Sequence, residues 1–202
     1  MNSQNSWSAR LAVLPDARAE GVVRDTRQWL ERVVIGLNLC PFAKAVHVKG
    51  QIHYTVSEAT QPGELLDHLR VELDALVASD VEQIETTLLI APNCLADFLD
   101  FNDFLELAER VVRKRKLEGV IQLATFHARY QFAGTEADDV TNFTNRAPYP
   151  TLHLLRETSI DRAVEVFPET DAIYETNMLT MRRLGVQGWR ELDVGASQGT
   201  RQ

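Results

Sequence analysis

Residues that bind anions or move protons are concentrated between positions 127 and 153. His127 and His153 carry imidazoles, which exchange protons near neutral pH and suit acid–base catalysis. Amides beside a guanidinium suit a carboxylate or phosphate. The candidates for such binding are Asn142, Asn145 and Arg146. The pattern predicts a polar site for a small anionic molecule.

The same residues also have a purely structural interpretation. Residues 127–150 form a connection much longer than the usual ~4–6 residues. Aromatic residues within it, such as Phe132 and Phe143, predict that it is ordered. Polar side chains in a long ordered loop often bind the loop's own backbone. In the apolar run TLHLLR, His153 also fits a hydrogen-bonded core histidine, so both interpretations stay open.

A short helix is predicted over residues 136–144, because Thr135 and Asp138 resemble a capping box. Such a helix aligns polar residues on one side at three- and four-residue spacing. They are Asp138, Asn142, Asn145 and Arg146. The competing expectation is that Arg146 bridges Asp138 or Asp139 inside the loop.

Cys40, followed by Pro41, is the candidate nucleophile. If Pro41 opens a new helix, Cys40 is its N-cap and the helix dipole favours the thiolate. At the end of the preceding helix the dipole favours the thiol instead. A cysteine nucleophile would also need its sulfur within hydrogen-bond reach of His127 or His153. A buried structural cysteine is the alternative.

An alternation of helices and strands must position these residues. Hydrophobic periodicity predicts helices over residues 18–37, from 62 onward, and over 95–117, 159–166 and 172–184; it predicts strands over 51–57, 86–91, 120–126 and 151–156. This order indicates an α/β fold with a mixed, mostly parallel sheet, helical crossovers and a helical C-terminal region. We expect one domain over residues 16–194, with flexible tails at 1–15 and 195–202.

The two most apolar predicted strands, residues 86–91 and 120–126, are expected to be adjacent, parallel and central. In such sheets ligands bind outside the carboxyl ends of the strands. Three loops qualify by this rule: those that begin after Ser57, at Pro92 and at His127. The loop at His127 is the richest in polar residues.

Composition narrows the classes of function. The chain has 202 residues, two cysteines and a formal net charge of −8. An acidic protein repels a phosphate backbone, so nucleic acid is not an expected partner. No apolar run approaches the ~18 residues of a membrane span, and no signal peptide is recognisable. We expect a soluble, cytoplasmic protein. No histidine or cysteine spacing predicts a metal site, and neither a cofactor nor an oligomeric state follows from the sequence.

Three longer segments are distinctive: GLNLCPFA at 36–43, ATFHARYQFAG at 124–134 and TNRAPYPTLHLLRE at 144–157. Through them the chain resembles a mainly bacterial family catalogued as domain of unknown function 1415. The resemblance covers about residues 29–184. It implies no activity, but it selects the same segments as the residue chemistry does.

Three functions are compatible with these observations. The leading hypothesis is a small-molecule enzyme of hydrolase or transferase type that acts on an anionic substrate at residues 127–153. The second is a cysteine-dependent enzyme that uses Cys40 with a histidine. The third is a non-catalytic ligand-binding or assembly module, which predicts that the polar side chains of residues 127–153 pair with one another.

Overall fold

The computed structural model describes residues 17–166 and 170–196. The tail predicted at 1–15 lies outside these residues, as does most of the tail predicted at 195–202. The elements follow in this order: α1 (Ala17–Trp29), the π-helix η1 (Leu30–Ile35), α2 (Ala43–Val48), β1 (Ile52–Val56), α3 (Pro62–Ala78), β2 (Thr86–Ile90), α4 (Phe98–Lys114), β3 (Ile121–Phe126), the 3-10 helix η2 (Val140–Asn145), β4 (Thr151–Arg156), α5 (Glu157–Val166) and α6 (Thr170–Glu191).

Four strands form a mixed sheet in the described part of the chain, in the order β1-β2-β4-β3. β1 and β2 pair in parallel, whereas β4 runs antiparallel to both of its neighbours. The α/β class is confirmed, as is the helical C-terminal region formed by α5 and α6. The expectation of a mostly parallel sheet is wrong, because two of the three strand pairs are antiparallel.

The predicted pairing of residues 86–91 with residues 120–126 is also wrong, because β4 lies between β2 and β3. β3 ends at Phe126, which pairs with Thr151 at the start of β4. The long connection therefore leaves and re-enters the sheet at the same end, which makes the two strands antiparallel. β4 takes the central position, and β3 becomes an edge strand whose Gln122 is exposed.

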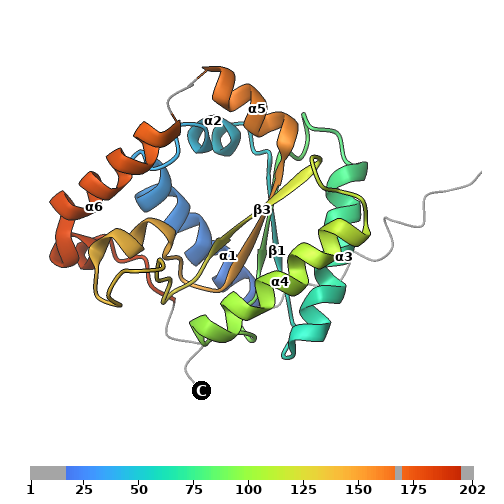
Figure 1. Cartoon of the computed structure of the whole chain (residues 1–202), viewed down its shortest axis with the longest axis horizontal. Helices are drawn as coiled ribbons and strands as arrows, with labels where there is room; N and C mark the ends of the chain where they lie inside the picture. The colour runs from blue at the N-terminus through green and yellow to red at the C-terminus, as the bar shows by residue number, and fades with distance from the viewer. Residues whose placement is uncertain (1–16, 167–169, 197–202) are drawn as a thin grey trace, which may run out of the picture.

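Helices cover both faces of the sheet. Figure 1 shows α3 and α4 on one side, and α1 and α6 on the other. The side chains of each strand alternate between the two faces. Leu89 and Leu152 pack with α3 and α4, whereas Leu88 and Ile90 pack towards α1. The fold thus has two separate hydrophobic layers.

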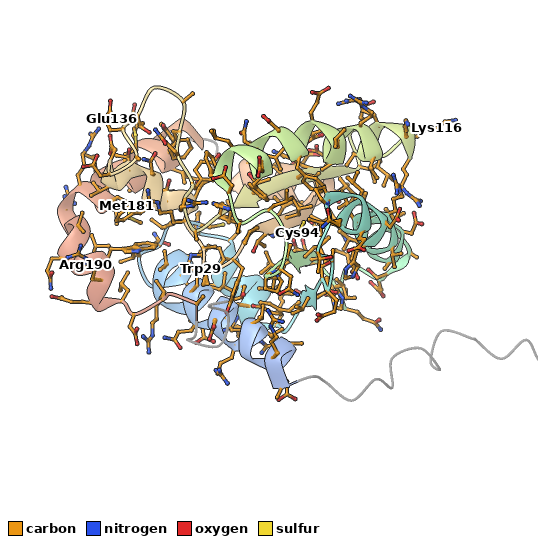
Figure 2. All side chains as sticks on the ribbon, turned by 90° about the horizontal axis from the view of Figure 1, so that it is seen from below. Trp29, Cys94, Lys116, Glu136, Met181 and Arg190 are labelled. Carbon is orange, nitrogen blue, oxygen red and sulfur yellow. The ribbon has the colours of Figure 1, made fainter. Side chains whose placement is uncertain are left out.

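The two layers have different members. The layer under α3 and α4 contains Cys94, which Figure 2 shows in the interior, far from Lys116 at the periphery. The layer on the other face contains Trp29 and Met181, each 1% exposed. Trp29 also stacks edge-on against Phe126 of β3, with ring centroids 4.9 Å apart.

The first predicted helix, residues 18–37, consists of α1 followed directly by the π-helix η1. Two hydrogen bonds with five-residue spacing show the wider turn: Gly36 N donates to Glu31 O, and Leu39 N donates to Val34 O, each over 2.9 Å. π-helical turns are rare and often occur near functional sites. This one leads directly into the segment that contains Cys40.

The N-terminus of α3 is capped by Glu64, a residue of the helix itself. Oε2 of Glu64 accepts hydrogen bonds from the backbone amides of Thr60 at 2.9 Å and Gln61 at 3.3 Å. A carboxylate here also complements the positive end of the helix dipole.

In the described residues, no helix has both the length and the apolar character that crossing a membrane requires.

Candidate functional site

The long connection between β3 and β4 is ordered around Asn142, which is 0% exposed. Its Oδ1 accepts hydrogen bonds from Phe132 N at 2.9 Å and Thr135 Oγ1 at 2.8 Å. Its Nδ2 donates to Glu136 O over 2.8 Å. All of these partners belong to the connection itself, so the amide of Asn142 holds two of its turns together.

The short helix in this connection differs from the prediction. It is the 3-10 helix η2, which begins later than expected and is capped by Asp139, whose Oδ1 accepts from Thr141 N at 2.8 Å. A 3-10 helix has three residues per turn, so the expected α-helical polar side does not form. Asn145, at its end, donates to Thr125 O over 3.3 Å.

Arg146 is half-buried and binds backbone carbonyls. Its Nε donates to Tyr130 O over 3.3 Å, and its Nη2 donates to Ala137 O over 2.6 Å. The guanidinium also lies 4.3 Å from the centroid of the Phe143 ring. The expected ion pairs with Asp138 or Asp139 are not formed in the described part of the chain. Two of its five N–H donors are therefore used within the connection.

His127, only 1% exposed, uses both of its ring nitrogens. Nδ1 accepts from Arg129 N at 3.0 Å, so Nε2 carries the proton that it donates to Leu95 O over 3.1 Å. The ring stacks on Phe101 of α4, with centroids 5.2 Å apart. Burial lowers the pKa of His127, which keeps the ring neutral near pH 7. These contacts favour a scaffolding role.

His153 faces the other side of the sheet and is half-buried. Its Nε2 lies 2.7 Å from Oγ1 of Thr86, and that hydroxyl donates its proton to Leu154 O over 2.6 Å. Nε2 of His153 must therefore be the donor in this pair. Desolvation lowers the pKa of His153 to about 4, so the ring is neutral near pH 7.

Cys40 lies between η1 and α2, and the N-cap of α2 is Phe42, so the expected N-cap position of Cys40 is not found. Cys40 packs, half-buried, against the layer that contains Trp29. Cys40 and His153 thus share one side of the sheet, whereas His127 lies on the other. Within the described residues, the structure records no hydrogen bond between Cys40 and a histidine.

A polar cluster that the sequence analysis did not select lies between β1 and α3. Ile52, Tyr54 and Val56 face α1, so the alternation of the strand turns His53, Thr55 and Ser57 towards α3. At its centre is Glu72 of α3, which is 7% exposed. Oε1 of Glu72 lies 3.2 Å from Nε2 of His68, and Oε2 lies 3.5 Å from Nε2 of His53.

Glu72 is a charged carboxylate in a largely buried place. Burial alone raises the pKa of its carboxyl group, but the hydrogen bonds and charges of His53 and His68 outweigh burial and lower that pKa to about 2. A buried carboxylate is costly unless it is paired and hydrogen-bonded. The two imidazoles provide this pairing, and Glu72 in turn fixes the orientation of both rings.

A hollow of about 470 Å³ opens beside this cluster, where the chain leaves the carboxyl end of β1. It is lined by Val56, Ser57, Glu58, Ala59, Glu64 and His68. The loop after Ser57 is one of the three that the sequence analysis marked as a position for ligands. The hollow therefore combines the expected location in an α/β sheet with an imidazole that a buried carboxylate orients.

Part of this cluster can be recognised in the sequence. His68 and Glu72 are four residues apart on a helix whose buried positions are otherwise leucines: Leu65, Leu69, Leu73 and Leu76. A charged residue in such a stripe indicates a partner.

In the described residues, no group of three or more histidine, cysteine, aspartate or glutamate side chains is arranged to hold a metal ion.

Comparison with known proteins gives a family but no function. No curated protein and no solved structure matches the chain. A family profile matches residues 21–191, which include η1, the β1–α3 cluster and the long connection. The chain therefore belongs to the family described as "Protein of unknown function (DUF1415)".

Proposed function

We propose that this protein is a small-molecule enzyme in which His68 is the acid–base group, at the hollow beside β1 and α3. The observation that carries the proposal is the pairing of buried Glu72 with His68, which itself lines the hollow. A carboxylate that orients an imidazole and stabilises its protonated form is a recurrent arrangement in general acid–base catalysis.

The pairing determines which nitrogen of His68 is available. When Nε2 donates its proton to Glu72, Nδ1 carries the lone pair that can accept a proton from a ligand. Nδ1 has no hydrogen-bond partner among the described residues, whereas both nitrogens of His127 are in use. This difference favours His68 over His127 as the proton acceptor.

Thr55 is not the nucleophile of a three-member relay in this proposal. Its Oγ1 lies 3.4 Å from Nε2 of His68, the same nitrogen that Glu72 contacts. A relay of the serine hydrolase type needs the nucleophile and the carboxylate on different ring nitrogens. The arrangement fits direct proton transfer to a bound molecule better than covalent catalysis.

The anionic substrate expected at residues 127–153 is a weaker candidate. Asn142 and the Nε and Nη2 groups of Arg146 already bind the connection itself. The cysteine-dependent alternative lacks a contact between Cys40 and an imidazole in the described residues. Mutual pairing of the loop side chains is what a scaffold requires, and it leaves the β1–α3 hollow as the better-supported site.

The test compares His68→Gln with His47→Gln in ligand-observed NMR against mixtures of small polar metabolites. His47 is the matched control, because its side chain is 27% exposed, as that of His68 is, and it also pairs with a glutamate, Glu31. We expect that compounds that bind the parent protein no longer bind His68→Gln but still bind His47→Gln. Equal binding by both variants would contradict the proposal.

A further inference from the structure

The charges around the hollow restrict what it binds. Its lining contains two carboxylates, Glu58 and Glu64, together with one imidazole and one hydroxyl, and none of the residues that line it is a lysine or an arginine. An anionic molecule would therefore meet charges of its own sign. A cation, in contrast, would be attracted at the mouth of the hollow.

The start of α3 does not reverse this preference. The amides at a helix N-terminus often bind anions, but here the carboxylate of Glu64 already accepts from Thr60 N and Gln61 N. Those hydrogen bonds lower the pKa of Glu64 and keep it charged. The positive end of the helix is thus neutralised by the protein's own side chain.

The hollow also contains a buried hydrogen-bond donor. Ser57 is 1% exposed, and its Oγ accepts from Ala59 N at 3.3 Å. The proton of this hydroxyl has no acceptor among the described residues. A buried donor without an acceptor is uncommon, and a ligand that carries a hydroxyl or carbonyl oxygen would satisfy it.

We infer that the ligand of the hollow is a small amine that also carries a hydroxyl or carbonyl oxygen, and that His68 accepts a proton from its ammonium group. This inference rests on the proposed function. Glu58 attracts the ammonium group, Ser57 donates to the ligand oxygen, and Glu72 compensates the charge that His68 gains.

The proton transfer is balanced by groups that are present. One N–H bond of the ammonium group breaks, and its electron pair stays on the ligand nitrogen. The proton forms a new bond with Nδ1 of His68, and the imidazolium is paired with the carboxylate of Glu72 through Nε2. The product is a neutral amine, which is nucleophilic, whereas an ammonium ion is not.

The test uses three four-carbon compounds that share a terminal hydroxyl and differ at the other end: aminobutanol, butanediol and hydroxybutanoate. Their binding is followed by NMR titration of the ring signals of His68. We expect aminobutanol to bind at least about threefold more tightly than butanediol, and hydroxybutanoate to bind most weakly.

Glu58→Gln separates the charge at the hollow from the charge of the whole chain. The change should weaken the binding of aminobutanol about two- to fivefold and leave the binding of butanediol unchanged. Glu118→Gln removes an exposed carboxylate elsewhere and is the control, because a net charge of −8 attracts any cation weakly. Glu58→Lys should make hydroxybutanoate the better ligand of the two charged compounds.

Two kinds of failure can be told apart. If none of the three compounds binds, or if aminobutanol has no advantage that depends on Glu58, the amine inference is overturned. If aminobutanol binds with the expected dependence on Glu58 but equally well to His68→Gln, without shifting the His68 ring signals, the ligand class stands. In that case the acid–base role of His68 is lost, and the inferred proton transfer is lost with it.

Discussion

The connection between β3 and β4 and the cluster between β1 and α3 use polar residues in opposite ways. In the connection, side chains such as Asn142 and Arg146 bind mainly backbone groups. In the β1–α3 cluster, Glu72 binds two other side chains, His53 and His68. The first kind of bonding is what a long ordered loop needs in order to satisfy its own amides and carbonyls.

The second kind satisfies no backbone group, so the fold itself does not require it. A buried ion pair between a strand and a helix can often be replaced by apolar side chains at no loss of stability. The presence of such a pair beside a hollow is therefore better explained by what it does for a ligand. The comparison teaches that the partners of a polar side chain, more than its residue type, separate scaffold from site.

The largest expected effect is that of Asn142→Ala in the connection. The change removes a fully buried amide and leaves Phe132 N, Thr135 Oγ1 and Glu136 O without that partner, so we expect the free energy of unfolding to fall by roughly 3–5 kcal/mol. Urea denaturation measures it, with Asn102→Ala on the exposed face of α4 as the control. A loss below about 1 kcal/mol would show that Asn142 does not hold the connection together.

Next comes the pH dependence of Glu72→Gln. The pKa of Glu72 is about 2 in the folded protein against 4.5 for an unperturbed glutamate, so the folded state binds fewer protons between these values. The ionised carboxylate of Glu72 therefore contributes roughly 3 kcal/mol to the free energy of unfolding above about pH 4.5, and this contribution is lost as the pH falls towards 2.

Unfolding curves of parent and variant should therefore converge as the pH decreases through that window. Glu118→Gln, which removes an exposed carboxylate, controls for the change in net charge. A difference between parent and Glu72→Gln that stays constant from pH 5 to pH 2 would contradict the charged network.

Arg146→Ala tests whether Arg146 in the connection is a scaffold residue or a ligand-binding residue. Losing the hydrogen bonds to Tyr130 O and Ala137 O should lower the free energy of unfolding by about 2 kcal/mol. Thermal unfolding with and without phosphate or carboxylate metabolites is the measurement. If anions stabilise the parent protein but not the variant, Arg146 binds a ligand and the connection is more than a scaffold.

The smallest effect, of opposite sign, is expected for Tyr54→Phe. The hydroxyl of Tyr54 is buried without a hydrogen-bond partner in the described residues, and burial raises its pKa to about 12. Its removal should stabilise the protein by roughly 1 kcal/mol or leave it unchanged. Tyr149→Phe is the matched control, because Tyr149 donates to Asp25 over 2.7 Å. Destabilisation by both changes would reveal a hidden partner of Tyr54.

The elements of the fold were largely predictable, because each depends on local periodicity. The run TLHLLR forms a strand over Thr151–Arg156, as predicted, and Pro62 opens a helix. The order of the strands was not predictable in this way. Two apolar strands separated by a helix look adjacent in sequence, and no local pattern indicates that β4, which begins at Thr151, lies between them.

The candidate site was predictable only in part. The loop after Ser57 was one of three that the sequence marked as positions for ligands, behind the loop at His127, and the spacing of His68 and Glu72 is visible on one helix. Their third partner, His53, lies on a strand, so that contact appears only when β1 packs on α3. For the connection that contains Asn142 and Arg146, the aromatic residues correctly indicated an ordered loop. The sequence could not distinguish a backbone carbonyl from a ligand as the partner.

The central position of β4 also constrains the order in which the chain can assemble. β2 has no neighbour on one of its edges until β4 has been synthesised, whereas β3 and β4 can pair as soon as their connection is complete. We expect the β3–β4 pair to form first and the parallel β1–β2 pair, whose closure spans the helix α3, to follow. The β2–β4 contact joins strands that are farther apart in the chain, so we expect it to form last. Pulsed hydrogen exchange during refolding should protect Leu154 earlier than Tyr54; simultaneous protection would indicate that the sheet forms in one step.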